Sequence, residues 1–161
     1  MAAEYSIITA QTVQPGQAAL FPVATYPCRS WYIFHREGSG IFRLANRVRY
    51  SGNCGCRRPI FETLYNVEFH GNIAVAEGGT VGPISLALVV DGEIDPESVM
   101  TVTPAAVGDL FNIGTGIVVA VPSICGCSNV SVKNISTTPV EISNAVIKFD
   151  TAGVRRVSCC G

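Results

Sequence analysis

Seven cysteines are the residues of this chain whose type and spacing come closest to a chemical site. They are Cys28, Cys54, Cys56, Cys125, Cys127, Cys159 and Cys160. The two Cys-Gly-Cys pairs could supply four thiolates to zinc, but the usual spacing in such sites is Cys-x₂-Cys. Neighbouring cysteines form strained rings when they bond to each other, so disulfides would link different pairs or different chains. The candidates for such bonds are Cys54, Cys56, Cys125, Cys127, Cys159 and Cys160.

Reduced structural thiols are the alternative for these cysteines, because the N-terminal residues do not resemble a secretory signal. Residues 1–17 have no basic segment followed by an unbroken apolar run. We therefore expect the chain to be made in a host cytoplasm. Because Cys-x-Cys is not the usual spacing of a zinc site, we also expect no metal site.

Catalysis is not expected from the other polar residues. His35 and His70 are the only histidines, and neither lies in a recognisable nucleophile context such as Gly-x-Ser-x-Gly. The acidic stretch 91–97 alternates carboxylates but does not match the calcium-binding EF-hand. No phosphate loop or dinucleotide fingerprint is present, so we expect no cofactor and no enzymatic activity.

Arginines are concentrated in residues 35–59, which contain six of the eleven basic residues. They are Arg36, Arg43, Arg47, Arg49, Arg57 and Arg58. Most carboxylates follow this stretch, and opposite charges on different sectors favour docking between proteins. We predict that these six arginines form a docking face, with a solvated arginine-rich surface as the alternative. Exposed aromatic residues such as Trp31 or Tyr50 would instead allow glycan binding.

The composition predicts that the chain assembles with copies of itself or into a larger particle. Charged residues make up 14% of the 161 residues and apolar ones 48%, whereas an ordinary soluble domain is about 25% charged. Part of the surface is therefore expected to be covered by other copies or by a larger particle. The net charge of −1 gives no general attraction to nucleic acid or anionic membranes. The longest apolar runs are shorter than the ~18 residues of a membrane span.

Short β-rich segments separated by turn residues predict an antiparallel sandwich or barrel. We expect strands over residues 17–23, 30–35, 40–45, 62–70, 72–77, 84–92, 98–104, 116–122, 129–136 and 140–150. In the segment 129–136, Val130 and Val132 alternate with Ser131 and Lys133, as in a strand with one buried face. Asp91-Gly92 is a hairpin-turn signal.

Three segments of the chain resemble small proteins from phages and prophages of gut Firmicutes. They are HREGSGIFRL at 35–44, the stretch ETLYNVEF…DLFNI at 62–113, and VSVKNISTTPVEISNAVIKF at 130–149. Residues 62–149 are also similar to the trimeric jelly rolls of the tumour-necrosis-factor and complement-head type. That similarity lies in ISLALVVDGE, in VAVPSICGCSNVSVKNIS and in the final apolar strand AVIKF.

The resemblance implies an all-β protein, an antiparallel β-sandwich of the jelly-roll type that forms a homotrimer. One sheet would face the threefold axis and bury apolar residues of strands such as the last one. We expect an extended N-terminal arm at 1–17, pairing with a neighbouring sheet edge, the jelly roll at 18–150 and a C-terminal tail at 151–161.

The function predicted from these observations is that of a non-enzymatic structural protein on the virion surface, a capsid decoration or stabilising protein. Its partners would be its own copies and a neighbouring capsid or other particle protein, without direct contact to membrane or nucleic acid. A spore-surface or appendage subunit cross-linked by cysteines is one alternative. A glycan-binding head of a fibre is the other.

Overall fold

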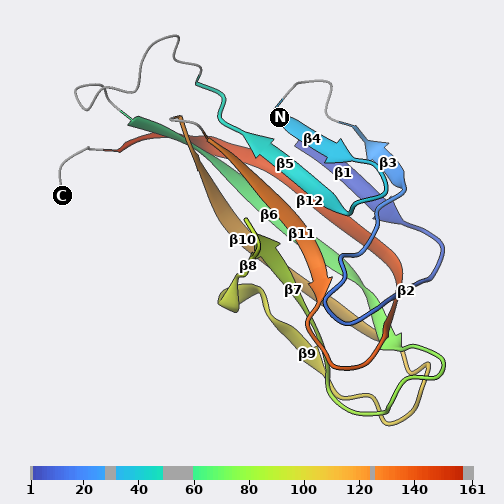
Figure 1. Ribbon diagram of the computed structural model, residues 1–161. Coiled ribbons are helices and arrows are strands. Elements are labelled where there is room, and N and C mark those ends of the chain that lie inside the picture. The colour runs from blue at the N-terminus through green and yellow to red at the C-terminus, as the bar shows by residue number, and fades with distance from the viewer. Residues whose placement is uncertain (1, 28–31, 49–59, 124–125, 158–161) are drawn as a thin grey trace.

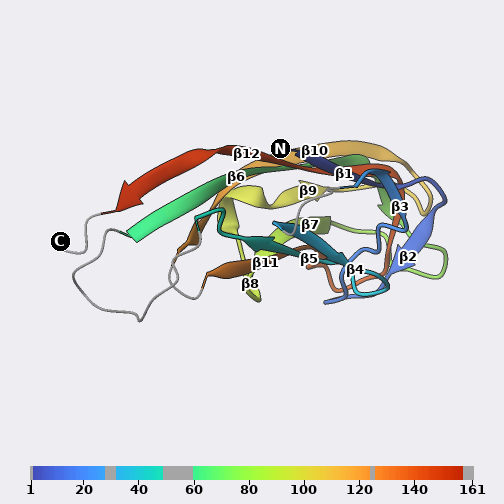
Figure 2. The same ribbon diagram turned by 90° about the horizontal axis from the view of Figure 1, so that it is seen from above.

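The structure, a computed structural model, describes residues 2–27, 32–48, 60–123 and 126–157. Within these residues the chain forms two six-stranded antiparallel sheets packed face to face (Figures 1 and 2). Sheet A has the order β10 (Phe111–Pro122), β6 (Ile60–Val75), β12 (Val140–Val157), β1 (Ala2–Ile7) and β3 (Val23–Tyr26), with β2 (Gln11–Val13) paired to β12. Sheet B has the order β4 (Ile33–Arg36), β5 (Ile41–Ala45), β11 (Cys127–Asn134), β7 (Ile84–Val90) and β8 (Glu93–Ile94), with β9 (Met100–Val102) paired to β7. A 3₁₀ helix, η1 (Pro96–Ser98), joins β8 to β9.

The core lies between the two sheets because each strand places alternate residues on its inner face. In β1, Ala3, Tyr5 and Ile7 are buried, whereas Glu4 and Ser6 are only half-buried on the outer face. The largest fully buried side chains are aromatic and come from both sheets and the segment before β3; they include Phe21, Phe42, Tyr65, Phe69 and Phe149. Each buried side chain of this size stabilises the sandwich by about 2–3 kcal/mol.

The prediction of an all-β antiparallel sandwich is confirmed. The predicted hairpin turn at Asp91-Gly92 is also confirmed, because Val90 pairs with Glu93 and both turn residues have positive φ, 52° and 93°. The strands expected at 62–70 and 72–77 form the single strand β6. β6 continues past Gly71 because its pairing with β10 is unbroken there, with Gly71 opposite Ile113. Gly71 also passes very close to β12, since a Cβ at that position would lie 2.5 Å from the Ala145 Cβ.

The predicted N-terminal arm is wrong. β1 lies inside sheet A, paired with β12 on one side and with β3 on the other. β2 also pairs with β12. The alternation of small and polar residues in β1 gives a weak strand signal, and β12 supplies the pairing partner from the other end of the chain. Of the segment 17–23, expected as a strand, only Val23 lies in one, while Ala18 forms an isolated bridge to Lys133.

The predicted boundary after Asp150 is wrong as well. β12 runs on to Val157 because β6 extends alongside it, with Gly153 opposite Leu64. The apolar residues of the last strand, such as Ile147 and Phe149, point into the sandwich core. Its outward residues are therefore not the apolar set that we expected at a threefold axis.

A candidate docking surface on sheet B

A groove of about 780 Å³ lies on the outer face of sheet B. Strands β4, β5 and β11 and the β7–β8 turn contribute its walls. Its lining includes Phe34, Arg36, Ile41, Arg43, Val89, Asp91, Asn129, Ser131 and Lys133. We call this set the B face.

The β4–β5 hairpin brings the two arginines of the B face together. Phe34 is paired with Arg43 and Arg36 with Ile41, so all four side chains lie on the same side of the sheet. Ser39 closes the turn, since its hydroxyl donates to the Arg36 carbonyl at 2.7 Å and accepts from the Ile41 N–H at 3.2 Å.

Gly40 allows the hairpin to lie against the segment before β3. Its φ is +64°, and a Cβ there would be 2.2 Å from the carbonyl oxygen of Ala19. Only glycine fits such a close approach in this conformation. The position of the two arginines thus depends on a residue that carries no side chain.

Cations dominate the groove. Two ion pairs occur among the described residues, Lys148 with Glu4 and Arg155 with Glu62, and neither involves Arg36, Arg43 or Lys133. One carboxylate, that of Asp91, lines the same groove and accepts the backbone N–H of Asn129 at 2.7 Å.

Apolar side chains lie beside these cations. Phe34 is 58% exposed and Ile41 is 38% exposed. Exposed apolar residues next to unpaired cations are suited to contact with an acidic protein surface.

The structure brings together two of the six arginines predicted to dock, Arg36 and Arg43. Arg47 lies just beyond the end of β5, where its guanidinium carbon is 6.0 Å from the centre of the Tyr32 ring. It does not line the groove. Arg49, Arg57 and Arg58 lie outside the described residues, as do Trp31 and Tyr50.

Sequence reasoning missed Lys133, Phe34 and Asp91 as members of this surface. Lys133 comes from β11, which pairs with β5 and β7 through contacts distant in sequence. The alternation of Val130 and Val132 with Lys133 placed it on an outer face, but only the strand order places it beside the arginines.

Cys127, at the start of β11, is a free thiol opposite Ala45. The other five predicted disulfide candidates lie outside the described residues. They are Cys54, Cys56, Cys125, Cys159 and Cys160, and Cys28 also lies outside them. Within the described ranges, no three His, Cys, Asp or Glu side chains are grouped so as to hold a metal ion.

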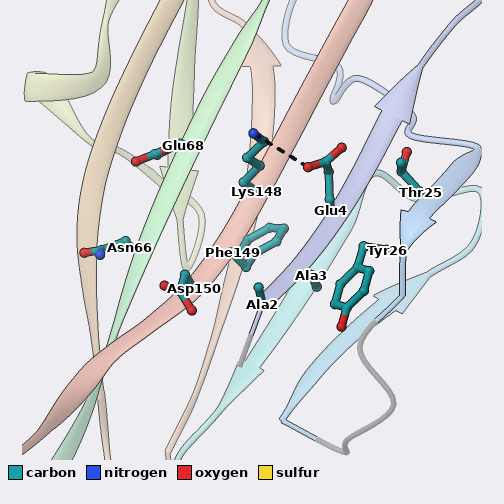
Figure 3. A pocket seen from close by; sticks show the side chains of 10 residues that line it. All are labelled: Ala2, Ala3, Glu4, Thr25, Tyr26, Asn66, Glu68, Lys148, Phe149 and Asp150. Atoms are coloured by element: carbon teal, nitrogen blue, oxygen red, sulfur yellow. Dashed lines mark ion pairs between the residues drawn. The ribbon is translucent and has the colours of Figure 1, made fainter.

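A second pocket, of about 540 Å³, lies on the outer face of sheet A (Figure 3). The Lys148 ammonium lies 3.7 Å from the Glu4 carboxylate across β12 and β1. Glu68 and Asp150 carry further carboxylates into the same pocket, and the Tyr26 ring stands at its edge, 64% exposed. The charged groups that line this pocket are therefore mainly carboxylates.

The two histidines do not share a site. The His35 ring stacks on Phe42 between the sheets, with 4.5 Å between ring centres, whereas His70 is exposed on β6 of sheet A. Desolvation by burial lowers the pKa of His35, and the nearby carboxylate of Glu37 opposes this by raising it. His35 is therefore mainly neutral at pH 7 and packs as an aromatic residue.

Among the described residues, no helix is long and apolar enough to span a membrane. No known protein family and no curated protein matches the sequence. Solved structures with the same architecture do match. The globular domain of a zebrafish complement 1qA protein aligns over 94% of this chain and 96% of its own, with 11% identity and a TM-score of 0.57.

The tumour-necrosis factor Eiger from S. frugiperda aligns over 95% of this chain and 92% of its own, with 11% identity and a TM-score of 0.59. The chain is a jelly roll. At this level of identity the similarity establishes the fold, and the function has to be argued from the surface of this chain.

Proposed function

We propose that this protein is a non-enzymatic binding head that docks on an acidic protein surface through the B face. The observation that carries the proposal is the group of three cations, Arg36, Arg43 and Lys133, which have no ion-pair partner among the described residues. Their positive potential would steer an acidic partner, and Phe34 and Ile41 would supply the apolar contact.

We further propose that the docked partner belongs to a particle, and that the protein serves as a capsid decoration protein on a virion surface. One observation supports this role, which is that a low proportion of charged residues is typical of chains covered by neighbours. The choice of a virion comes from the sequence resemblance stated above, and no family model or curated protein matches the chain to support it.

A homotrimer is part of the proposal. The jelly-roll fold and the resemblance to trimeric heads support it. In this arrangement the outer face of sheet A would line the threefold axis, where carboxylates such as Glu68 meet ammonium groups such as Lys148 of a neighbouring copy. These are polar contacts, so we expect a trimer that is weakened by salt.

Binding to immobilised poly-glutamate tests the docking proposal, because that polymer presents the chemistry of an acidic protein surface. Replacing both arginines, Arg36→Ser with Arg43→Ser, should weaken binding by about tenfold or more at low salt. Arg155→Ser is the matched control, since Arg155 is exposed but pairs with Glu62, away from the groove. Equal binding by the double variant and the parent would contradict the proposal.

Light scattering with and without reductant tests the trimer. We expect a mass three times that of the 17.0 kDa chain, independent of reductant. Polymers that dissociate only with reductant would favour the cysteine-linked appendage subunit. A monomer at all concentrations would contradict the trimer.

Glycan binding is a second candidate function because Tyr26 is an exposed aromatic in a pocket that also contains the polar side chains of Thr25 and Asn66. Aromatic faces of this kind stack on sugar rings while neighbouring polar groups bind hydroxyls. A glycan array with the parent and Tyr26→Ala distinguishes the two functions. Sugar binding that is lost in Tyr26→Ala and kept in the arginine double variant would favour the glycan-binding head.

A further inference from the structure

Strand β10 forms a long, open edge of sheet A. It pairs with β6 on one side, and no strand of the described residues pairs with its other side. The other edge strands of the two sheets are short: β3 and β4 have four residues each and β8 has two. Short edge strands are one way in which proteins prevent pairing with other chains. β10, with 12 residues, lacks this protection.

Other features that block pairing are also missing from β10. Residues 111–121 contain no charged side chain and no proline. The pairing of β10 with β6 runs from Phe111 to Pro122 without a register shift, so no bulge bends this edge away. Charged residues, prolines and bulges are the usual means of protecting an edge strand. The edge of β10 is therefore able to accept another strand.

The strand register shows which backbone groups of β10 point outward. The Ser123 N–H donates to the Phe61 carbonyl at 2.7 Å, next to the last pair of the ladder, Pro122 with Glu62. In an antiparallel ladder, residues bonded to the partner strand alternate with residues whose N–H and C=O groups point away from it. The outward-pointing groups of β10 therefore belong to Asn112, Gly114, Gly116, Val118 and Ala120.

A groove of about 480 Å³ lies at this edge. β10 lines it with Gly116, Ile117 and Val118, and the segment that contains η1 lines it with Asp95 and Glu97. η1 lies beside β10 (Figure 1). An extended segment bound to the edge of β10 would thus have η1 on the side that faces sheet B.

The charged residues that line the groove, as the described residues form it, are all acidic: Glu68, Asp95 and Glu97. Neither of the two ion pairs among the described residues includes them. Asp95 also caps η1, because its carboxylate accepts the Glu97 N–H at 3.0 Å. The Glu97 residue is exposed. These carboxylates favour a partner with positive charge.

Exposed apolar side chains lie at the same edge. Val118 is 62% exposed, and Val99, directly after η1, is also exposed. A strand added to β10 would remove apolar surface of Val118 from water, which favours binding.

We propose that the edge of β10 binds an extended segment of a partner protein that carries lysine or arginine at alternate positions. The segment would add a strand to sheet A, with its backbone bonded to the outward-pointing groups of β10. Because side chains alternate along a strand, every second residue faces η1, and cations at these positions reach Asp95 and Glu97. This site is separate from the B face, and the inference does not depend on docking there.

Charge favours a basic segment over a second copy of β10. Two copies paired through β10 about a twofold axis would both bring Asp95 and Glu97 to the shared edge, and like charges oppose such an interface. β10 also offers no cation to the groove of the other copy, because residues 111–121 are uncharged.

Binding of a synthetic peptide to the full chain tests the proposal. The probe is a labelled Lys-Val-Lys-Thr-Lys-Val-Lys peptide with blocked ends, measured by fluorescence anisotropy at low salt. We expect it to bind, and the same peptide with glutamate in place of lysine should bind at least about tenfold more weakly. A lysine peptide that does not bind would overturn the inference.

Two N-methylated forms of the lysine peptide separate strand addition from attraction by charge alone. One is methylated on the backbone nitrogens of its lysines, the other on those of its valines and threonine. Only one edge of the peptide pairs with β10, so one form should lose binding and the other should keep it. Equal binding by both forms would show that no strand is added, and the inference would be wrong.

Variants of the protein locate the bound peptide. Val118→Pro removes an outward-pointing N–H without removing a bond to β6, and Glu97→Lys reverses a charge in the groove. Each should raise the Kd for the lysine peptide about tenfold or more. Val118→Thr keeps the N–H, and Glu77→Lys makes the same charge change at an exposed residue outside the groove. Both controls should bind like the parent.

Glu97→Lys and the methylated peptides keep the test decisive if Val118→Pro fails to fold. Equal binding of the lysine peptide by Glu97→Lys and Glu77→Lys would place the peptide elsewhere and overturn the inference. Light scattering of the folded Val118→Pro variant gives the last outcome. If its mass is lower than that of the parent, a second copy occupies the edge of β10 and the basic segment is the wrong partner.

Discussion

The imidazole of His35 stacks on the phenyl ring of Phe42 with their planes 16° apart, and the Tyr5 ring lies 4.9 Å from the imidazole centre. This places a titratable ring among aromatic residues between the two sheets. The His35 Nε2 atom is enclosed and has no hydrogen-bond partner among the described residues, although the residue as a whole is half-buried. A proton on this ring is thus poorly solvated in the folded protein.

We expect the stability of the sandwich to fall as the pH drops below 6.5. Desolvation lowers the pKa of His35 in the folded protein, with the Glu37 carboxylate partly opposing it, while the unfolded chain keeps the ordinary value of 6.5. Between these two values the unfolded chain binds more protons, so protonation favours unfolding. Above pH 6.5 the ring is neutral in both states and this effect is absent.

Urea unfolding at pH 5 and pH 8 measures this effect. His35→Phe should lose less stability than the parent between the two pH values, because its ring stacks without taking up a proton. His70→Gln is the control, since His70 is exposed on the other sheet. The same pH dependence in His35→Phe and in the parent would show that His35 does not cause it.

Replacing Asn134 by Ala should destabilise the protein by about 2–4 kcal/mol. Its side chain is fully buried, and its Nδ2 donates to the carbonyls of Val13 and Thr138, at 2.9 Å each. Its Oδ1 accepts the N–H of Ser136. Removing the amide leaves these backbone groups without partners in the interior.

Thermal or urea unfolding measures the change, and Asn112→Ala is the comparison. Asn112 is exposed and its side chain donates only to that of Asn72, at 3.1 Å. We expect a change within about 0.5 kcal/mol for this control. Similar losses in the two variants would mean that the buried amide is not the cause.

Gly40→Ala should unfold the β4–β5 hairpin or destabilise the protein by several kcal/mol, on the order of 3. The added Cβ would overlap the Ala19 carbonyl oxygen in a backbone conformation with positive φ. Gly38→Ala isolates the conformational part of this cost, because Gly38 has φ +72° with no atom within 4 Å of its Cβ position. We expect a loss of about 1 kcal/mol there.

The two glycine variants are compared by chemical unfolding. If Gly38→Ala and Gly40→Ala lower the free energy of unfolding by the same amount, the contact with Ala19 contributes nothing to the loss in Gly40→Ala. A hydrogen-exchange measurement would show which strands are destabilised, since only Gly40→Ala should expose the backbone of β4 and β5.

The ion pair between Arg155 and Glu62 should contribute little to stability. Its Nε–Oε2 distance is 2.7 Å, but the Arg155 side chain is 61% exposed, so water and salt screen the attraction. A double-mutant cycle with Arg155→Gln and Glu62→Gln should give a coupling of about 0.5 kcal/mol that decreases with salt. A coupling well above 1 kcal/mol would mean that this end of sheet A is less hydrated than its exposure implies.

Local signals in the sequence predicted the elements that depend on local physics. The pair Asp91-Gly92 predicted the β7–β8 turn because few other residue pairs adopt positive φ at two successive positions. The alternation of Val130 and Val132 with polar residues predicted the strand β11. β1 was missed because its pairing with β12 joins opposite ends of the chain, and no local pattern reports such a partner.

The candidate surface could be predicted only in part for the same reason. Arg36 and Arg43 meet because a hairpin pairs their neighbours in sequence. Arg47 follows at a similar spacing but lies past the end of β5, and only the strand bounds exclude it. Lys133 and Asp91 reach the groove through sheet order, which depends on how distant strands pack rather than on local sequence.

The direction of β12 gives the molecule two distinct ends. Ala2 pairs with Asp150 near one end, where β12 leaves the sandwich, while the loop between β9 and β10 lies at the other (Figure 1). The 18 residues of β12 span about 60 Å. A foreign epitope inserted at the exposed residues Ala105–Gly108 would therefore be presented far from a tag attached at the opposite end, with the B face untouched. This geometry suits a display scaffold, in which one end of the protein is anchored and the other end carries the inserted epitope.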